Sequence, residues 1–135
     1  MDSTRQKFSK KERLCSRKII TALFESGNTF FTPEFKVIWD VVPKDSGVPA
    51  QVMFTVSKRT FRHAVERNLI KRRMREAFRK QKSIIYEPLA GIKVRLVFIV
   101  IYRNSHIRDY SVFESAIREM LVSLSDMLRK KAIMC

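Results

Sequence analysis

The distribution of apolar residues along the chain separates segments with the two-residue period of strands from segments with the longer period of helices. Residues 33–43 lie between two prolines and are rich in β-branched and aromatic residues, which predicts a strand. One face of this strand would carry Phe35, Val37, Trp39 and Val41, and the other Lys36, Ile38 and Asp40. Residues 44–49 supply turn-forming residues, and residues 51–58 have the pattern of an antiparallel partner, so we expect a β-hairpin.

Helical periodicity marks segments near both ends of the chain. The first helix spans residues 16–26, and Gly27 stands where a left-handed C-terminal cap would lie. Its apolar side consists of Ile19, Ile20, Leu23 and Phe24. The last helix opens with Ser111 and Glu114, which have capping-box spacing, and it continues as an amphipathic helix of about five turns to Leu128.

A strand at residues 93–102 is apolar on both faces, which predicts a central, buried position in the sheet. Pro88 and Gly91 are expected to break the chain before it. With the basic helix described below, the element order is α-β-β-α-β-α, an α+β fold in which one domain forms an α/β sandwich around a mostly antiparallel sheet. The strand–helix–strand unit can form a parallel crossover, which is right-handed by the general rule.

The domain boundaries follow from composition. We expect a flexible basic arm at residues 1–9, a single domain at residues 10–131 and a short tail at residues 132–135. A chain of 135 residues is long enough to bury a core of its own without disulfides or metals.

The segment from Arg62 to Lys80 holds eight Lys or Arg among nineteen residues, with only Glu66 and Glu76 as acids. At about 100° per residue, its basic and polar positions gather in one arc of about 140°. That arc contains Arg67, Asn68, Lys71, Arg72, Arg75 and Arg79. The neighbouring face contains Ile70, Met74, Ala77 and Phe78, which can pack on a core. A solvated helix normally alternates acids with bases, so this pattern favours nucleic-acid binding.

The net charge of the chain is +15, from 28 basic and 13 acidic residues, and an anionic partner is the usual reason for such an imbalance. Nucleic acid is the first candidate, followed by an anionic membrane surface and then an acidic protein. No apolar run is long enough to span a membrane, and the N-terminus has no secretory signal pattern, which favours a cytoplasmic protein. Isolated Cys15, Cys135, His63 and His106 have no ligand-like spacing, and we expect neither a metal site nor catalytic side chains.

Together these segments resemble the protein subunit of bacterial ribonuclease P, over roughly residues 10–130. The family signature is approximately V-S-K-(K/R), a short variable stretch and A-V-x-R-N-R-x-K-R. This chain has it as Val56-Ser57-Lys58-Arg59, Ala64-Val65-Glu66-Arg67-Asn68 and Leu69-Ile70-Lys71-Arg72-Arg73, followed by Arg75. The element order is also similar to that of the family.

The resemblance implies a function in which RNA performs the catalysis. The RNA subunit cuts the 5′ leader from precursor tRNA with Mg²⁺ ions that the RNA mainly holds, and the protein binds this RNA and the single-stranded leader. The resemblance also implies a left-handed crossover, against the general rule, and likeness to a ribosomal-protein domain. It implies neither a DNA nor a membrane partner, and no obligate protein partner is evident.

The resemblance assigns roles to residues at matching positions. The RNA-binding residues would be Lys58, Arg59, Arg67, Asn68, Lys71, Arg72, Arg73, Arg75 and Arg79. Ile20, Phe24 and Ile38 would line a leader cleft between the first helix and the sheet. From periodicity alone, Phe24 could either lie against the sheet or line a groove.

The chain departs from the family pattern in two ways. Leu69 stands where the family usually has arginine, and adjacent Arg73 could partly compensate. Ile20 and Ile38 replace aromatic residues, so base stacking worth about 1–3 kcal/mol per base would be reduced. We expect weaker leader affinity or an altered leader preference.

Three other functions fit parts of the sequence. A ribosomal or other structured-RNA-binding protein would have similar charge and elements. A DNA-binding regulator is disfavoured because the basic helix lies between strands and lacks a helix-turn-helix partner. A protein-only nuclease would need clustered carboxylates for metal ions, which the sequence does not show.

Overall fold

The computed structural model describes residues 8–44 and 47–134, and it contains four helices, a short 3₁₀ helix and four strands in this range. In chain order the elements are η2 (Lys10–Glu12), α1 (Arg17–Ser26), β1 (Asn28–Phe31), β2 (Phe35–Pro43), β3 (Ala50–Thr55), α2 (Ala64–Gln81), α3 (Ser83–Leu89), β4 (Val94–Tyr102) and α4 (Tyr110–Met134). The α+β class is therefore confirmed.

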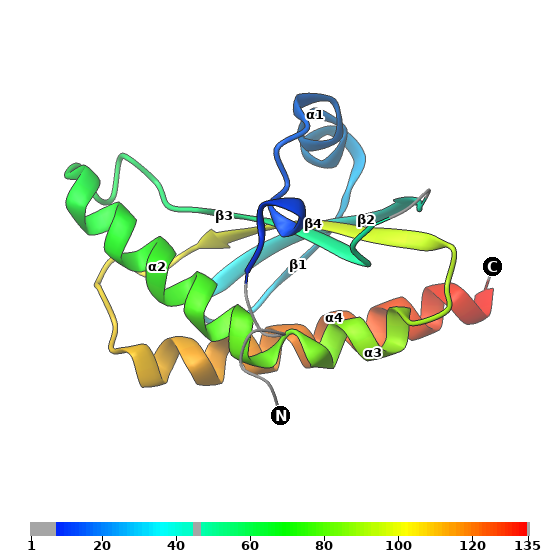
Figure 1. The fold of residues 1–135 in the computed structure, drawn as a ribbon. Coiled ribbons are helices and arrows are strands. Elements are labelled where there is room, and N and C mark those ends of the chain that lie inside the picture. Colours follow the sequence, from blue (N-terminus) through cyan, green and yellow to red (C-terminus); the bar gives the residue numbers. More distant parts are fainter. Residues whose placement is uncertain (1–7, 45–46, 135) are drawn as a thin grey trace.

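The four strands form one sheet in the order β1-β2-β4-β3. β2 pairs antiparallel with both β1 and β4, whereas β3 pairs parallel with β4. Helices α2, α3 and α4 cover one face of the sheet, and α1 lies on the other (Figure 1). The mostly antiparallel sheet and the parallel β3–α2–β4 connection are confirmed, while the left-handed sense of that connection stays a prediction.

The predicted hairpin is wrong. β2 and β3 do not pair with each other, because β4 lies between them and pairs with both. Phe98 and Ile99 of β4 are completely buried on opposite faces of the sheet. A central position between two strands therefore buries more apolar surface of β4 than an edge position would. The sequence pattern also gave no sign of β1, which is only four residues long.

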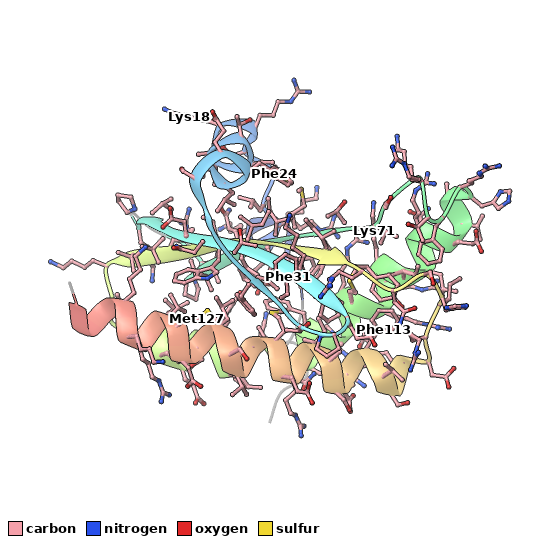
Figure 2. All side chains as sticks on the ribbon, turned by 180° about the vertical axis from the view of Figure 1, so that it is seen from behind. Lys18, Phe24, Phe31, Lys71, Phe113 and Met127 are labelled. Carbon is pink, nitrogen blue, oxygen red and sulfur yellow. The ribbon has the colours of Figure 1, made fainter. Side chains whose placement is uncertain are left out.

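The main core lies between the sheet and helices α2 to α4. Phe35, Val37 and Trp39 of β2 contribute the face that the alternation predicted, and they pack with residues of β3, β4 and the three helices. A smaller cluster on the opposite face joins Leu23 of α1 to Ile38 of β2 and to neighbouring residues of β4. Figure 2 shows Phe24 on α1, on the opposite side of the sheet from α4, which carries Phe113 and Met127.

Gly27 does not adopt the left-handed conformation that we expected. It follows α1 with a φ of −70° and a ψ of 158°, which any residue can adopt. Glycine is required at this position for a steric reason instead. A Cβ there would lie 2.6 Å from the Leu23 carbonyl oxygen and 2.7 Å from Cγ2 of Ile38. The absence of a side chain lets the end of α1 approach the sheet closely.

The remaining differences concern where helices begin and end. α4 begins at Tyr110, so Ser111 lies inside its first turn and is not the capping residue we predicted. Pro88 lies within α3, and the chain leaves that helix through Ala90 and Gly91, whose φ of +77° suits glycine. The basic helix begins at Ala64 and ends at Gln81.

Both predicted terminal segments extend beyond the described residues. Most of the arm predicted at residues 1–9 lies outside them, although Phe8 is described and packs against the main core. At the other end, α4 continues through Met134, within the predicted tail. Over the two described ranges, no helix is both long and apolar enough to cross a membrane.

Candidate nucleic-acid interface

The apolar stripe of α2 fixes how this helix presents its charges. Ile70, Met74, Ala77 and Phe78 are at most 1 % exposed, so they anchor the helix in the main core. Asn68, Arg72 and Lys80 are exposed, and the remaining basic residues are partly buried beside this stripe: Arg67, Lys71, Arg73, Arg75 and Arg79. The periodicity predicted one basic arc beside one apolar face, whereas the helix carries its charges on an outer face and on both flanks of the buried stripe.

Some predicted RNA-binding residues already hold parts of the fold together. The Arg67 guanidinium donates hydrogen bonds to the carbonyls of Phe61 and Arg62, at 2.7 and 2.9 Å, and so closes the loop between β3 and α2. Arg73 donates to the Arg108 carbonyl, which joins the opposite flank of α2 to the segment before α4. These contacts position both guanidinium groups at the surface, where each keeps further donors for a ligand.

Among the predicted RNA-binding residues, Arg79 forms an ion pair with a described acid. Its guanidinium pairs with Glu76 one turn earlier, and the Nε–Oε1 distance is 3.0 Å. The hydrogen bond from Arg79, together with its charge, holds the pKa of Glu76 below its usual range, so the carboxylate stays ionised and offsets Arg79. Lys58 and Arg59, in contrast, are exposed in the turn that leads from β3 toward α2.

One flank of α2 faces a groove that sequence analysis did not identify. Lys71 and Arg75 line it together with Arg13, while Cys15 and the end of β3 complete the wall; its volume is about 290 Å³. Burial, followed by the neighbouring Arg13 charge, lowers the pKa of Arg75. No described acid forms an ion pair with these three cations, so the groove favours a phosphate group.

Arg13 reaches the groove because the N-terminal segment is attached to the edge of the sheet. The backbone N–H of Leu14 donates to the Val52 carbonyl at 3.0 Å, and Gln51 Nε2 donates to the Lys11 carbonyl at 3.0 Å. The segment thereby covers the open edge of β3. Residues near position 13 and the helix at position 75 are far apart in sequence, and no local pattern signals their proximity.

A buried polar cluster holds the same segment against α3. Glu12 is 3 % exposed and accepts hydrogen bonds from the Ser9 N–H at 2.7 Å, from Lys82 Nζ at 2.7 Å and from the Tyr86 hydroxyl. Burial opposes the charge on Glu12, but the contacts with Lys82, Ser9 and Tyr86 outweigh it and lower its pKa. Burial and the same carboxylate raise the pKa of Tyr86.

The three predicted cleft residues differ in what they present to a ligand. Phe24 is 56 % exposed and offers an open aromatic ring beside the sheet, whereas Ile20 is half-buried. Ile38 is only 3 % exposed, because it packs beneath α1 with Leu23. In this structure Ile38 therefore supports α1, and Phe24 is the member of the set that a base can reach.

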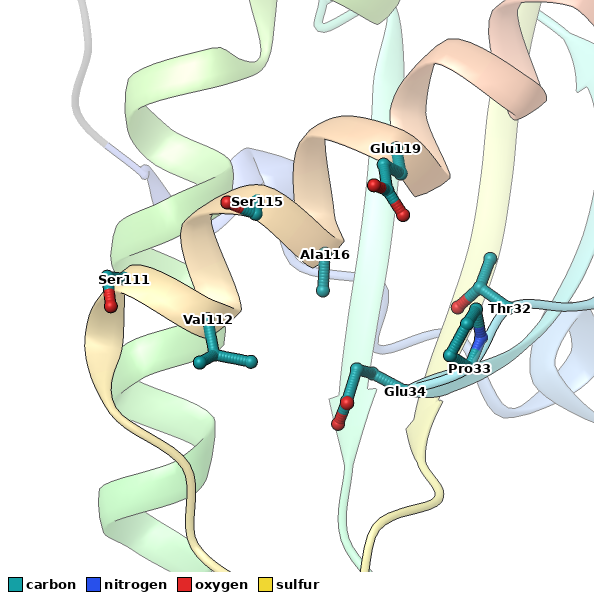
Figure 3. Close-up of a pocket in the computed structure, with 8 residues that line it drawn as sticks. All are labelled: Thr32, Pro33, Glu34, Ser111, Val112, Ser115, Ala116 and Glu119. Carbon is teal, nitrogen blue, oxygen red and sulfur yellow. The ribbon is translucent and has the colours of Figure 1, made fainter.

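A second cavity, of about 380 Å³, lies between the β1–β2 connection and α4 (Figure 3). Glu34 and Glu119 line it together with the hydroxyl residues Thr32, Ser111 and Ser115. Two carboxylates make it unfavourable for a phosphate. Among the residues that the structure describes, no three His, Cys, Asp or Glu side chains gather as potential metal ligands.

Comparison with known proteins places this arrangement in a family. The ribonuclease P family model matches residues 8–125. A ribonuclease P protein component from Porphyromonas gingivalis is 26 % identical over 125 residues, which cover 93 % of this chain and 91 % of that protein. The corresponding protein from Chlorobium phaeobacteroides is 30 % identical over 122 residues, which cover 83 % of this chain and 84 % of its own length.

Solved structures share the fold. The Staphylococcus aureus RNase P protein has a TM-score of 0.63 and 22 % identity, and the match covers 84 % of this chain and 94 % of that one. The Thermotoga maritima protein has a TM-score of 0.64 and 23 % identity, over 83 % and 96 % of the two chains. Since the family model spans most of the sequence, this chain belongs to the ribonuclease P protein family.

Proposed function

We propose that this chain is the protein subunit of ribonuclease P, which binds the catalytic RNA and the 5′ leader of precursor tRNA and so promotes removal of that leader. The observation that carries the proposal is the family match over residues 8–125. The uncompensated cations of the groove agree with it, because a single-stranded leader brings phosphates without a folded partner to shield them.

The surfaces of α2 suggest a division between the two RNA ligands. The outer face, with Asn68 and Arg72, together with Lys58 and Arg59 at the helix start, would contact the catalytic RNA. The groove flank, with Lys71 and Arg75, would contact leader phosphates. Arg67, Arg73 and Arg79 would then add contacts from positions that intramolecular hydrogen bonds already fix.

The leader bases would meet the α1 side of the sheet, where Phe24 presents an open ring. Stacking on an aromatic side chain is tolerant of sequence, because every base has a flat face. One protein could therefore hold many different leaders. Ile20 would contribute apolar contact at the rim, whereas Ile38 would act by supporting α1 from beneath.

The chain is expected to assist the reaction without a catalytic side chain of its own. A charge of +15 neutralises phosphates of two RNAs that otherwise repel each other, and it releases their counterions. Holding the leader also raises the effective concentration of the scissile phosphate at the reaction centre. Mg²⁺ for the reaction would be held mainly by the RNA, and the complex would act in the cytoplasm.

The leader contact can be tested with the reconstituted RNA–protein complex. Affinity should be measured for a precursor tRNA with a leader and for the same tRNA without one. Wild type should prefer the leader-bearing substrate, and Lys71→Ala with Arg75→Ala should remove most of that preference while leaving affinity for mature tRNA unchanged. A matched double variant, Arg129→Ala with Lys130→Ala on exposed α4 positions, removes the same charge and should keep the preference. An equal preference in all three proteins would contradict the groove assignment.

A further inference from the structure

The part of the sheet face that α1 leaves open carries a row of four side chains, one from each strand. Strand register joins them in the order Phe31, Lys36, Ile101 and Thr55, from β1 across β2 and β4 to β3. Directly paired residues point to the same face of a sheet, so the four form a continuous line. In the adjacent row Ile38 and Ile99 are buried under α1, whereas no member of this row is buried.

An exposed aromatic ring stands at the β1 end of the row. Phe31 is 59 % exposed, and among the ten phenylalanines only Phe24 is similarly open to solvent. The Arg103 guanidinium lies 4.9 Å from the centre of the Phe31 ring, and Lys36 Nζ lies 5.8 Å from it. An exposed ring with two cations nearby can attract both the flat face of a base and the phosphate next to it.

Arg103 is held in place from two directions. Its Nη1 donates to the Thr32 carbonyl at 2.7 Å, and its backbone N–H donates to the Glu34 carbonyl at 2.9 Å. The guanidinium is therefore fixed on the β1–β2 connection before any ligand arrives. Lys36 differs, because its ammonium forms no hydrogen bond or ion pair with any described residue and can turn toward a phosphate.

The other end of the row opens into the cationic groove. Thr55 lines that groove together with Lys71 and Arg75. Three interstrand spacings separate the β1 and β3 ends, a distance of about 14 Å along the sheet. A single strand whose phosphates lie in the groove can therefore cross all four strands and reach Phe31 within a few nucleotides.

We propose that Phe31 and Arg103 form a stacking platform for one unpaired base of the leader, and that Lys36 binds the adjoining phosphate. The proposal rests on the proposed function and adds a second contact at the far edge of the sheet. The base stacks on the open side of the ring and guanidinium, while the backbone follows the row toward the groove. The platform compensates for the aliphatic residues at positions 20 and 38.

The test measures affinity of the reconstituted complex for precursor tRNAs whose leaders increase one nucleotide at a time. With wild type, affinity should rise in steps as the leader reaches each contact. Phe31→Ala should remove the increase in affinity that appears when the leader is long enough to reach Phe31. Affinity for these longer leaders should fall about five- to tenfold, and affinity for the shortest leaders should stay unchanged. Phe31→Tyr should restore the step, since a phenol ring also stacks.

Val122→Ala serves as the matched control, because Val122 is an exposed apolar residue on α4, away from the row. It should behave as wild type at every leader length. If Phe31→Ala keeps the full series of steps, the platform is overturned while the proposed function stands. If its loss is equal at all lengths, the ring contacts the catalytic RNA and the assignment to the leader is overturned. If wild type shows no leader dependence at all, the proposed function itself fails.

Discussion

Replacing Glu12 with glutamine should lower the free energy of unfolding by about 2–3 kcal/mol at neutral pH. The side chain is 3 % exposed and accepts hydrogen bonds from Ser9, Lys82 and Tyr86. Breaking a buried ion pair by removing one partner costs about 3–5 kcal/mol. We expect a loss of about 2–3 kcal/mol, at or below the lower end of that range, because glutamine keeps an acceptor oxygen and the long Lys82 side chain can turn toward water.

The size of the effect converts into a measurable shift of the melting temperature. An unfolding entropy of about 2.1 cal/mol/K per residue gives about 0.28 kcal/mol/K for a chain of 135 residues. A loss of about 2–3 kcal/mol should therefore lower Tm by about 7–11 °C. Circular dichroism at the helix band would follow the transition. Glu87→Gln is the matched control, because Glu87 is an exposed carboxylate on α3.

The effect should also depend on pH in a defined direction. The pKa of Glu12 is lowered in the folded state, so the unfolded chain binds a proton more readily as the pH falls. The ionised carboxylate therefore stabilises the fold fully above its unfolded pKa of about 4.3, and this contribution disappears as the pH falls through the lower folded pKa. The Tm difference between wild type and Glu12→Gln should shrink in that acid range. A difference that stays the same from neutral to strongly acid pH would refute the reasoning.

Two further changes test the packing of α1 and the outer face of α2. Gly27→Ala should lower the free energy of unfolding, measured in urea, by about 1–3 kcal/mol, because the new Cβ would collide with the Leu23 carbonyl and Ile38. An unchanged free energy of unfolding would contradict the close approach of α1 to the sheet. Arg72→Ala should reduce the slope of log K against log salt for catalytic-RNA binding by about one unit, since one phosphate contact is lost. Arg129→Ala on α4 should leave that slope unchanged, and an equal change in both variants would argue against a specific contact by α2.

Much of the fold was predictable because its elements have strong local patterns. The alternation in β2, the apolar character of β4 and the periodicity of α2 each reflect which side chains the core must bury. The pairing of β2 with β3 was wrong because short turn-rich connections favour hairpins, and local sequence does not show that a later strand enters between two earlier ones. The close approach at Gly27 likewise depends on Ile38 of another element.

The candidate site divides in the same way. The basic arc of α2 was visible in its sequence, because charge and helical period are local properties. The convergence of Arg13 with Lys71 and Arg75 was not visible, because it depends on the N-terminal segment attaching to β3. Phe31 was missed for a related reason, since it lies on a four-residue strand with no clear alternation. Its register with Lys36 places it at the β1 end of the row that leads across the sheet to the groove.

The most direct test of the central claim is multiple-turnover cleavage of a leader-bearing precursor tRNA at low Mg²⁺. A bacterial ribonuclease P RNA would be assayed with and without this protein, and the protein would also be assayed alone. The account predicts correct 5′ maturation that requires both components. Cleavage by the protein alone would contradict the assignment of catalysis to RNA, and no stimulation of several such RNAs would contradict the subunit function itself.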